Sequence, residues 1–266
     1  MGIGLEGRVA VVTGSAMGIG KAIASTLAQR GADVACWDVA EPALLETVKG
    51  IQDAGHRWEN HGQSRCVKVS SVRVDVTSSI DVDRAVKRTI DDLGDVDILV
   101  NVAGGSLGAA RGIDDLTEDD WDRVMALNLR APFLTAKAFA GGMKRRRWGR
   151  IVNIASGAGR SYSRSRVIPY AAAKAGLLGF TRQLAVDLAP YGVNVNAVSP
   201  GAIASVPNSG WKQMPEAQQR AVLDTVASRR FGESAEIAGA VAFMVSDDAS
   251  YIVGQTLGVD GGHWMF

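Results

Sequence analysis

The chain has 266 residues, 47% of them hydrophobic and 21% charged, which is the composition of a globular protein and excludes a disordered one. Lys and Arg total 29 against 28 for Asp and Glu, so no overall field favours nucleic acid or an anionic membrane as a partner. Two cysteines are too few for a disulfide framework, and no apolar run approaches the ~20 residues of a membrane span. We therefore expect a soluble, cytoplasmic protein.

Short β-branched runs alternate with helical patterns along the whole chain. Strands are predicted at 8–13, 33–38, 66–75, 96–101, 150–156, 193–199 and 256–260, and helical spacing occurs at 18–30, 79–93, 117–147 and 169–190. Crossovers of this length imply parallel pairing with helices on both faces of the sheet. No linker divides the chain, which predicts a single Rossmann-type doubly wound α/β domain over 1–266, with about seven parallel strands.

Two stretches depart from this alternation. Residues 56–65, "HRWENHGQSR", lengthen the second crossover, and a solvated loop is favoured over a metal site because His56 and His61 come without further ligands at a zinc spacing. No metal is expected elsewhere. Residues 202–230 form a long irregular stretch that is predicted to be a lid over the substrate site.

The first glycine-rich stretch, "TGSAMGIG", follows a predicted strand and opens a predicted helix. Gly14, Gly18 and Gly20 allow a tight turn and a close approach to a ligand, and the helix N-terminus presents free N–H groups to a pyrophosphate. The spacing differs from the commoner GxGxxG, but its position between strand and helix favours a dinucleotide site.

Asp38 ends the second predicted strand, 18 residues beyond Gly20. A carboxylate at this place accepts hydrogen bonds from an adenosine ribose and repels a 2′-phosphate. Neither Met17 nor Val39 supplies an offsetting positive charge, so NAD is predicted in preference to NADP. The alternative is an ordinary aspartate in a turn.

The motifs arrive in the order found in the classical short-chain dehydrogenase/reductase family, which the chain resembles over essentially its whole length. The resemblance rests on "TGSAMGIG", on "DVT" at Asp75, on "NVAG" at 101–104 where the family usually has NNAG, on "LNL" around Asn128, on Ser156, on "YAAAK" and on "SPGAIAS" at 199–205. It implies NAD(P)-dependent oxidation or reduction on one Rossmann domain. The implied cofactor contacts are Gly14, Ser15, Met17, Gly18, Ile19, Gly20, Asp38, Asp75, Val76, Asn101, Ala103, Gly104, Tyr170, Lys174, Pro200, Gly201, Ile203 and Ser205.

In "YAAAK", Tyr170 and Lys174 lie one helical turn apart. Hydride transfer to or from a secondary alcohol needs a group that moves a proton at the same oxygen, and a nearby ammonium favours the phenolate form of a tyrosine. Tyr170 is therefore the predicted proton shuttle. The resemblance further implies that Lys174 binds the nicotinamide ribose, that Ser156 holds the substrate oxygen and that Asn128 supports Lys174 through a water and a proton relay.

The resemblance also implies a homotetramer, with dimer contacts on the helices at 117–147 and 169–190 and a further contact at the end of the sequence. The basic run "KRRRWGR" at 144–150 is interpreted as a solvated helix end rather than a nucleic-acid patch.

Three functions remain open at this stage. The first is an NAD-dependent dehydrogenase of a small polyol, sugar or sugar acid. The second is an NADPH-dependent 3-oxoacyl-acyl-carrier-protein reductase, which shares the catalytic motifs but in this family usually has Arg at the place of Met17. The third is a non-catalytic dinucleotide sensor. Arg164, six residues before Tyr170, is a candidate for binding a substrate carboxylate through two parallel hydrogen bonds. The alternative is that it faces solvent or a neighbouring subunit.

Overall fold

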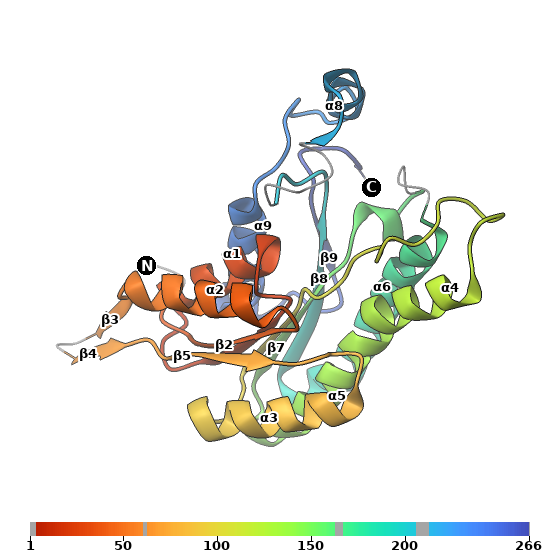
Figure 1. Ribbon diagram of the computed structural model, residues 1–266. Coiled ribbons are helices and arrows are strands. Elements are labelled where there is room, and N and C mark those ends of the chain that lie inside the picture. The colour runs from red at the N-terminus through yellow and green to blue at the C-terminus, as the bar shows by residue number, and fades with distance from the viewer. Residues whose placement is uncertain (1–3, 61–62, 163–166, 206–212, 266) are drawn as a thin grey trace.

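One seven-stranded sheet forms the centre of the molecule (Figure 1). The computed structural model describes residues 4–60, 63–162, 167–205 and 213–265. All strand pairs of this sheet are parallel, and the strands follow the order β5-β2-β1-β6-β7-β8-β9. The strands are β1 (Val9–Thr13), β2 (Asp33–Asp38), β5 (Val69–Arg73), β6 (Ile98–Asn101), β7 (Gly149–Ile154), β8 (Val193–Pro200) and β9 (Thr256–Val259). The predicted doubly wound fold is confirmed.

Helices cover both faces of this sheet. One layer contains α1 (Gly18–Gln29), α2 (Glu41–Asp53) and α9 (Ser234–Met244), and the other contains α3 (Ser79–Leu93), α5 (Ala131–Arg146) and α6 (Ile168–Leu188). Successive strand residues point to opposite faces, so Ala10 and Val12 of β1 pack into the first layer while Val9 and Val11 pack into the second. Burial on both faces explains why the strands read as continuous apolar runs.

The stretch 117–147 is not the single helix that its spacing predicts. It consists of α4 (Glu118–Met125), a π-helical turn (Ala126–Arg130) and α5. The side chain of Asn128, inside the π turn, donates from Nδ2 to the carbonyl oxygens of Val124 and Gly105, at 2.9 and 2.8 Å. A polar side chain that bonds the preceding turn competes with the regular helical ladder, and π turns are frequent at functional sites.

The prediction of a loop at 56–65 is also wrong. The antiparallel strands β3 (Arg57–Asn60) and β4 (Gln63–Cys66) form a small separate sheet. The predicted strand 66–75 therefore covers the last residue of β4 as well as β5. A polar hairpin lacks the apolar alternation by which a half-buried strand is recognised, so its sequence resembles a loop. His61 lies outside the described residues.

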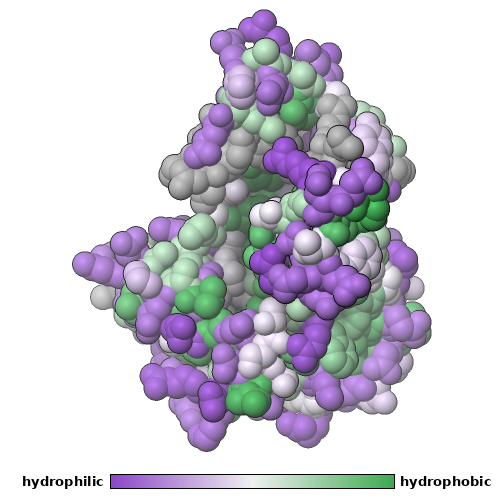
Figure 2. Space-filling model, turned by 45° about the vertical axis from the view of Figure 1, so that its right-hand side comes forward, coloured by the Kyte–Doolittle hydropathy of each residue, from purple (hydrophilic) through white to green (hydrophobic). Residues whose placement is uncertain are grey.

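The strand order reverses beside β1, with β2 and β5 on one side and β6 on the other. Open parallel sheets bind ligands in the crevice outside the carboxyl ends of the strands at such a switch point. Figure 2 shows this part of the molecule hollowed below the region that carries α8 (Glu216–Leu223), with hydrophobic surface inside the hollow. Among the described helices, none combines the length and apolarity needed to cross a bilayer.

Candidate active site

The loop between β1 and α1 is shaped by its glycines. Gly14 and Gly18 have φ of +65° and +57°, a region that strains other residues. A Cβ on Gly20 would collide with the carbonyl oxygen of Gly14, so the loop needs glycine there for close contact. Met17 is the N-cap of α1 and makes no side-chain cap hydrogen bond, which leaves first-turn N–H groups available to an anionic ligand. These features fit a bound pyrophosphate.

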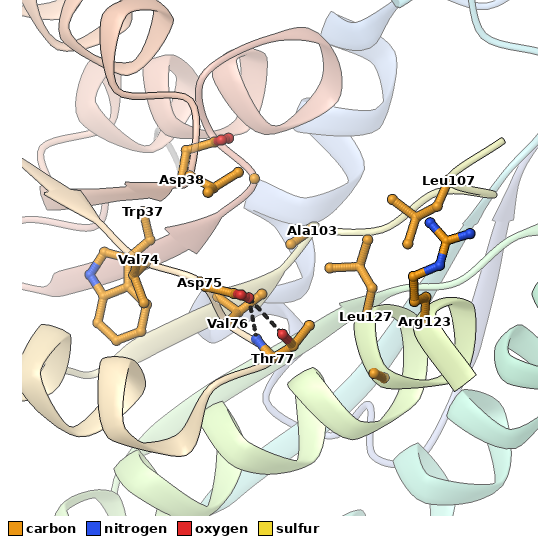
Figure 3. Close-up of a pocket in the computed structure, with 13 residues that line it drawn as sticks. Trp37, Asp38, Val74, Asp75, Val76, Thr77, Ala103, Leu107, Arg123 and Leu127 are labelled. Carbon is orange, nitrogen blue, oxygen red and sulfur yellow. Dashed lines mark hydrogen bonds between the residues drawn. The ribbon is translucent and has the colours of Figure 1, made fainter. Parts of the chain in front are cut away.

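A cavity of about 350 Å³ opens where β1, β2 and β5 end (Figure 3). Five predicted cofactor residues line it: Gly14, Asp38, Asp75, Val76 and Ala103. Sequence reasoning missed the rest of the lining, which consists of Trp37, Val39, Val74, Thr77, Leu107, Arg123, Ala126 and Leu127. Most of these had a signal in the sequence. Four of them adjoin the motif residues Asp38, Asp75 and Val76, namely Trp37, Val39, Val74 and Thr77, and Leu127 belongs to the motif "LNL".

The carboxylate of Asp38 is fixed at the edge of this cavity. Its Oδ2 accepts from the N–H of Ala16 and its Oδ1 from the N–H of Ala40, both at 2.9 Å. Each carboxylate oxygen has two lone pairs, so both can still accept from a ribose hydroxyl. Arg123 lies on the opposite side of the pocket in Figure 3 and forms ion pairs with Asp119 and Asp120. Arg123 therefore does not neutralise Asp38.

Asp75 belongs to the turn that follows β5. The backbone N–H and the hydroxyl of Thr77 both donate to its Oδ1, at 2.9 and 2.7 Å (Figure 3). This turn holds Val76 in the wall of the cavity. The motif "DVT" is thus a turn in which the aspartate and threonine position the valine between them.

A second cavity of about 230 Å³ lies further along the same crevice. Ala103 lines the first cavity and its neighbour Gly104 lines the second, so one loop after β6 borders both. The second cavity is lined by Ile19, Val102, Gly104, Ile154, Ala155, Ser156, Tyr170, Lys174, Pro200, Gly201, Ile203 and Ser205. Nine of the predicted site residues therefore meet here.

Ser156 and Tyr170 come from different elements and are hydrogen-bonded through their side chains. Ser156 follows β7 and caps the 3-10 turn Gly157–Gly159, where its Oγ accepts from the N–H of Ala158 at 3.2 Å. Tyr170 lies in the first turn of α6, after Pro169, whose missing N–H suits that position. Burial raises the pKa of Tyr170, and the hydrogen bond with Ser156 opposes that rise. Burial therefore has a larger effect on the pKa of Tyr170 than any group that favours the phenolate form.

Lys174 is 4% exposed, and its Nζ lies 5.6 Å from the ring centroid of Tyr170. It donates to the carbonyl oxygen of Ile154 at 2.8 Å. Burial disfavours the charged form and lowers the pKa of Lys174 to about 8. Among the described residues, no carboxylate forms an ion pair with it.

Asn128 clamps the loop that lines both cavities. Its Oδ1 accepts from the N–H of Gly105 at 3.0 Å, and its Nδ2 donates to the carbonyl oxygen of the same residue. A Cβ on Gly104 would lie 2.8 Å from Asn128 Oδ1 and 3.1 Å from Lys174 Nζ. The side chains of Asn128 and Lys174 thus approach the same glycine. This proximity is consistent with the predicted support of Lys174 by Asn128. The predicted water between them stays a prediction.

Several predicted site residues do not line either cavity. The Asn101 side chain bonds Asn153 and Thr135 within the core, and the Ser15 hydroxyl donates to the carbonyl oxygen of Trp37. Met17, Gly18 and Gly20 shape the glycine loop without lining the cavities. Arg164 lies outside the described residues.

Thr13, at the end of β1, was missed by sequence reasoning. Its Oγ1 accepts from the N–H groups of Val102 and Ala103, at 3.0 and 3.1 Å. It therefore ties the first βα loop to the loop after β6. The signal in the sequence is a hydroxyl residue at the first position of the glycine-rich stretch "TGSAMGIG".

Comparisons with known proteins agree on the family. A family model described as enoyl-(acyl carrier protein) reductase matches residues 14–263. The BbsD subunit of (2S)-((R)-hydroxy(phenyl)methyl)succinyl-CoA dehydrogenase from Thauera aromatica is 38% identical over 99% of both chains. The chain belongs to the classical short-chain dehydrogenase/reductase family. It is thus an oxidoreductase that acts on CH–OH groups with a nicotinamide dinucleotide, NAD or NADP, and the sensor hypothesis is set aside.

Other short-chain dehydrogenases differ in substrate. The 3-oxoacyl-acyl-carrier-protein reductase FabG of Vibrio cholerae is 38% identical over 98% of this chain and 99% of its own. A solved structure of a candidate gluconate dehydrogenase from Agrobacterium tumefaciens matches with TM-score 0.88 and 34% identity, covering 98% of this chain and 97% of that one. A 7α-hydroxysteroid dehydrogenase complexed with NADH matches with TM-score 0.88 and 32% identity over 98% and 95%.

Proposed function

We propose that this short-chain dehydrogenase/reductase interconverts a secondary alcohol and a ketone by hydride transfer with NAD. The observation that carries the proposal is the meeting of Ser156, Tyr170 and Lys174 in one cavity, on the same crevice as the cavity bordered by Asp38. The glycine loop and the open N-terminus of α1 lie beside both cavities and fit a dinucleotide. A bound nicotinamide would supply the hydride acceptor or donor.

Each side chain has a distinct part in this proposal. The Tyr170 hydroxyl moves a proton at the substrate oxygen, and Ser156, already its hydrogen-bond partner, holds the same oxygen. Lys174 is placed to bind ribose hydroxyls from the side of α6, and Asn128 holds the loop that faces it. Burial raises the pKa of Tyr170 and so favours the neutral phenol, the form that can protonate a carbonyl oxygen in the reductive direction.

The preference for NAD over NADP rests on Asp38. Both of its oxygens are anchored by backbone N–H groups, so the carboxylate cannot swing away from a 2′-phosphate without losing two hydrogen bonds. The nearest cation in the pocket lining, Arg123, is engaged with two aspartates. The likeness to a steroid dehydrogenase complexed with NADH supports the same preference.

For the substrate we propose a small polyol, sugar or sugar acid. The likeness to a candidate gluconate dehydrogenase supports this class. A second candidate is the reduction of a 3-oxoacyl thioester. It is favoured by two relatives at 38% identity that are named for a CoA thioester and for an acyl-carrier-protein thioester.

A cytoplasmic homotetramer, with residues 202–230 as the lid, completes the proposal. Support for subunit contact comes from an apolar hollow of about 520 Å³ on α4 to α6, lined in part by Met125, Leu129, Phe133 and Phe180. The large hydrophobic side chain of Phe133 is 45% exposed there. Light scattering of the purified protein tests the assembly.

One substrate panel tests the function. Polyols, sugar acids and 3-oxoacyl thioesters are assayed through nicotinamide absorbance, each with both cofactors. We expect turnover of a polyol or sugar acid with NAD at a higher kcat/KM than with NADP. Turnover restricted to 3-oxoacyl thioesters with NADPH would support the second candidate, and no turnover across the panel would contradict both substrate proposals.

A further inference from the structure

The segment after β9, residues 260–265, folds back on itself instead of running on from the sheet (Figure 1). Gly261 and Gly262 have φ of +64° and +79°, which makes the reversal. The carboxylate of Asp260 accepts from the N–H groups of Gly262 and Trp264, at 3.0 and 3.2 Å. The sequence "DGGHW" therefore encodes a defined turn that presents an indole.

This segment is bonded to the region that follows α8. The N–H of Ser228 donates to the carbonyl oxygen of Gly261 at 3.0 Å. The hydroxyl of Thr225 donates to the carbonyl oxygen of Val222 at 2.7 Å and lies 3.2 Å from Nε2 of His263. The side chains of Thr225 and His263 are thus hydrogen-bonded to each other. These hydrogen bonds join residues 225–228, at the end of the predicted lid, to the segment after β9.

The imidazole of His263 fixes the orientation of Trp264. The two rings stack with centroids 3.8 Å apart and an interplanar angle of 11°. Since His263 is held by Thr225 and Trp264 by Asp260, the indole is restrained through both its ring and its backbone. A side chain restrained in this way can hold the residues that it contacts in position.

The indole lies against the turn that carries Ser156. A Cβ placed on Gly157 would collide with the six-membered ring of Trp264, so glycine is needed there for the two to be in contact. A Cβ on Gly159, in the same turn, would lie 2.6 Å from the backbone carbonyl carbon of Lys174. The turn Gly157–Gly159 is thus in close contact with Trp264 and with the helix that carries Tyr170 and Lys174.

We propose that Trp264 is a positioning residue for Ser156. By holding the 3-10 turn against α6, the indole keeps the Ser156 hydroxyl within hydrogen-bond reach of Tyr170 and of the substrate oxygen. Trp264 is absent from the lining of either cavity and acts through Gly157. The inference rests on the proposed role of Ser156 and assigns a function to a segment outside the recognised motifs.

The test measures kcat, KM and the NADH dissociation constant of Trp264→Ala with the best substrate of the panel. Displacement of Ser156 weakens a contact made to the reacting oxygen, so we expect kcat to fall about 10- to 100-fold. NADH binding should change less than about twofold, because the glycine loop and Asp38, which border the first cavity, are untouched. Trp264→Phe, which retains an aromatic ring, should recover most of the loss. If Trp264→Ala does not fold, Trp264→Leu replaces it in every comparison.

A second pair of variants probes the contact itself. Gly157→Ala alone forces its new methyl group into the indole and should lower kcat, whereas adding Gly157→Ala to Trp264→Ala should cost little more, because the space is then open. Met265→Ala is the matched control, since Met265 is 79% exposed, and it should leave kcat unchanged.

Three results would overturn the inference: unchanged kcat in Trp264→Ala, equal loss of NADH affinity and kcat, or losses at Gly157 and Trp264 that simply multiply. The proposed function would still stand in each of these cases if the wild-type enzyme turns over a substrate of the panel and the Tyr170→Phe variant does not. The two failures can therefore be told apart.

Discussion

The two ends of the parallel strands, called here the amino edge and the carboxyl edge of the sheet, hold their buried cations in opposite ways. At the amino ends, the guanidinium groups of Arg8 and Arg150 lie 3.5 and 4.4 Å from the ring centroid of Trp148. Arg150, only 5% exposed, pairs with Asp247 at 3.3 Å, and Arg146 pairs with Asp95 at 3.2 Å. At the carboxyl ends, Lys174 is buried beside Tyr170 and bonds a backbone carbonyl oxygen instead of a carboxylate.

This contrast separates stability from chemistry within one sheet. At the amino edge opposite charges pair at the junctions between strands and helices, and each pair contributes at most about 1 kcal/mol to stability. At the carboxyl edge, burial raises the pKa of Tyr170 and lowers that of Lys174, so these groups are held in states that a ligand can change. The basic run 144–150, interpreted from sequence as a solvated helix end, is in large part an element of the stabilising edge, because Lys144, Arg146 and Arg150 all form ion pairs.

The largest effect is expected at Tyr170. Tyr170→Phe removes the hydroxyl that moves the proton but keeps the ring in its packing with Val124 and Val167. Activity should fall by about 10²- to 10⁴-fold with NADH affinity retained, as measured by steady-state kinetics and fluorescence titration. Turnover near the wild-type level in Tyr170→Phe would remove Tyr170 from the reaction.

The second effect concerns cofactor choice. Asp38→Asn removes the charge that repels a 2′-phosphate while keeping the side-chain size. The ratio of kcat/KM for NAD over NADP should fall about 10- to 100-fold, which corresponds to about 1.4–2.8 kcal/mol. Asp75→Asn is the matched control in the same pocket and should affect both cofactors alike. A wild-type enzyme that prefers NADP would show that the interpretation of Asp38 is wrong.

The third effect concerns the free energy of unfolding, which the buried charge of Lys174 at the carboxyl edge is expected to lower. The pKa of Lys174 in the folded protein is about 8, below the ordinary 10.5, so the unfolded chain binds more protons between these values. The contribution of Lys174 to the free energy of unfolding therefore rises as the pH increases from about 8 to 10.5, and it is unfavourable below pH 8. Lys174→Met should stabilise the protein without cofactor by about 1–2 kcal/mol at pH 7, with the gain shrinking toward pH 10.

Urea unfolding at pH 7 and pH 9.5 measures this effect. Lys87→Met is the control, since Lys87 is 77% exposed in its pair with Asp91 and its loss should change stability by less than about 0.5 kcal/mol. A gain from Lys174→Met that does not depend on pH would contradict burial of the charge as its cause.

The smallest effect is expected at the amino edge. Burial lowers the pKa of the Arg150 guanidinium and Asp247 opposes that shift, but Asp247 is 81% exposed and screened by solvent. Asp247→Asn should therefore lower the free energy of unfolding by no more than about 1 kcal/mol and leave kcat/KM unchanged. Thermal unfolding together with the kinetic assay checks both parts. A change in kcat/KM would mean that the two edges are coupled.

Local pattern was enough to predict the sheet and most of the cleft. β-branched runs separated by helical crossovers allow one arrangement, parallel strands covered on both faces, and that arrangement brings Gly14, Asp38 and Ser156 to the same edge. The spacing in "YAAAK" likewise places Tyr170 and Lys174 on one helical face before any tertiary contact is known.

Other features depended on groups that are distant in sequence. The direction of the pKa of Tyr170 depends on burial, which no spacing expresses, and the π turn at Asn128 forms where that side chain meets Gly105 across the fold. Trp264 has no motif to mark it, and only the reversal after β9 brings its indole to Gly157, 107 positions earlier in the chain. The desolvation of a side chain and its close contacts depend on neighbouring atoms from many segments of the chain. They are therefore determined only in the folded structure.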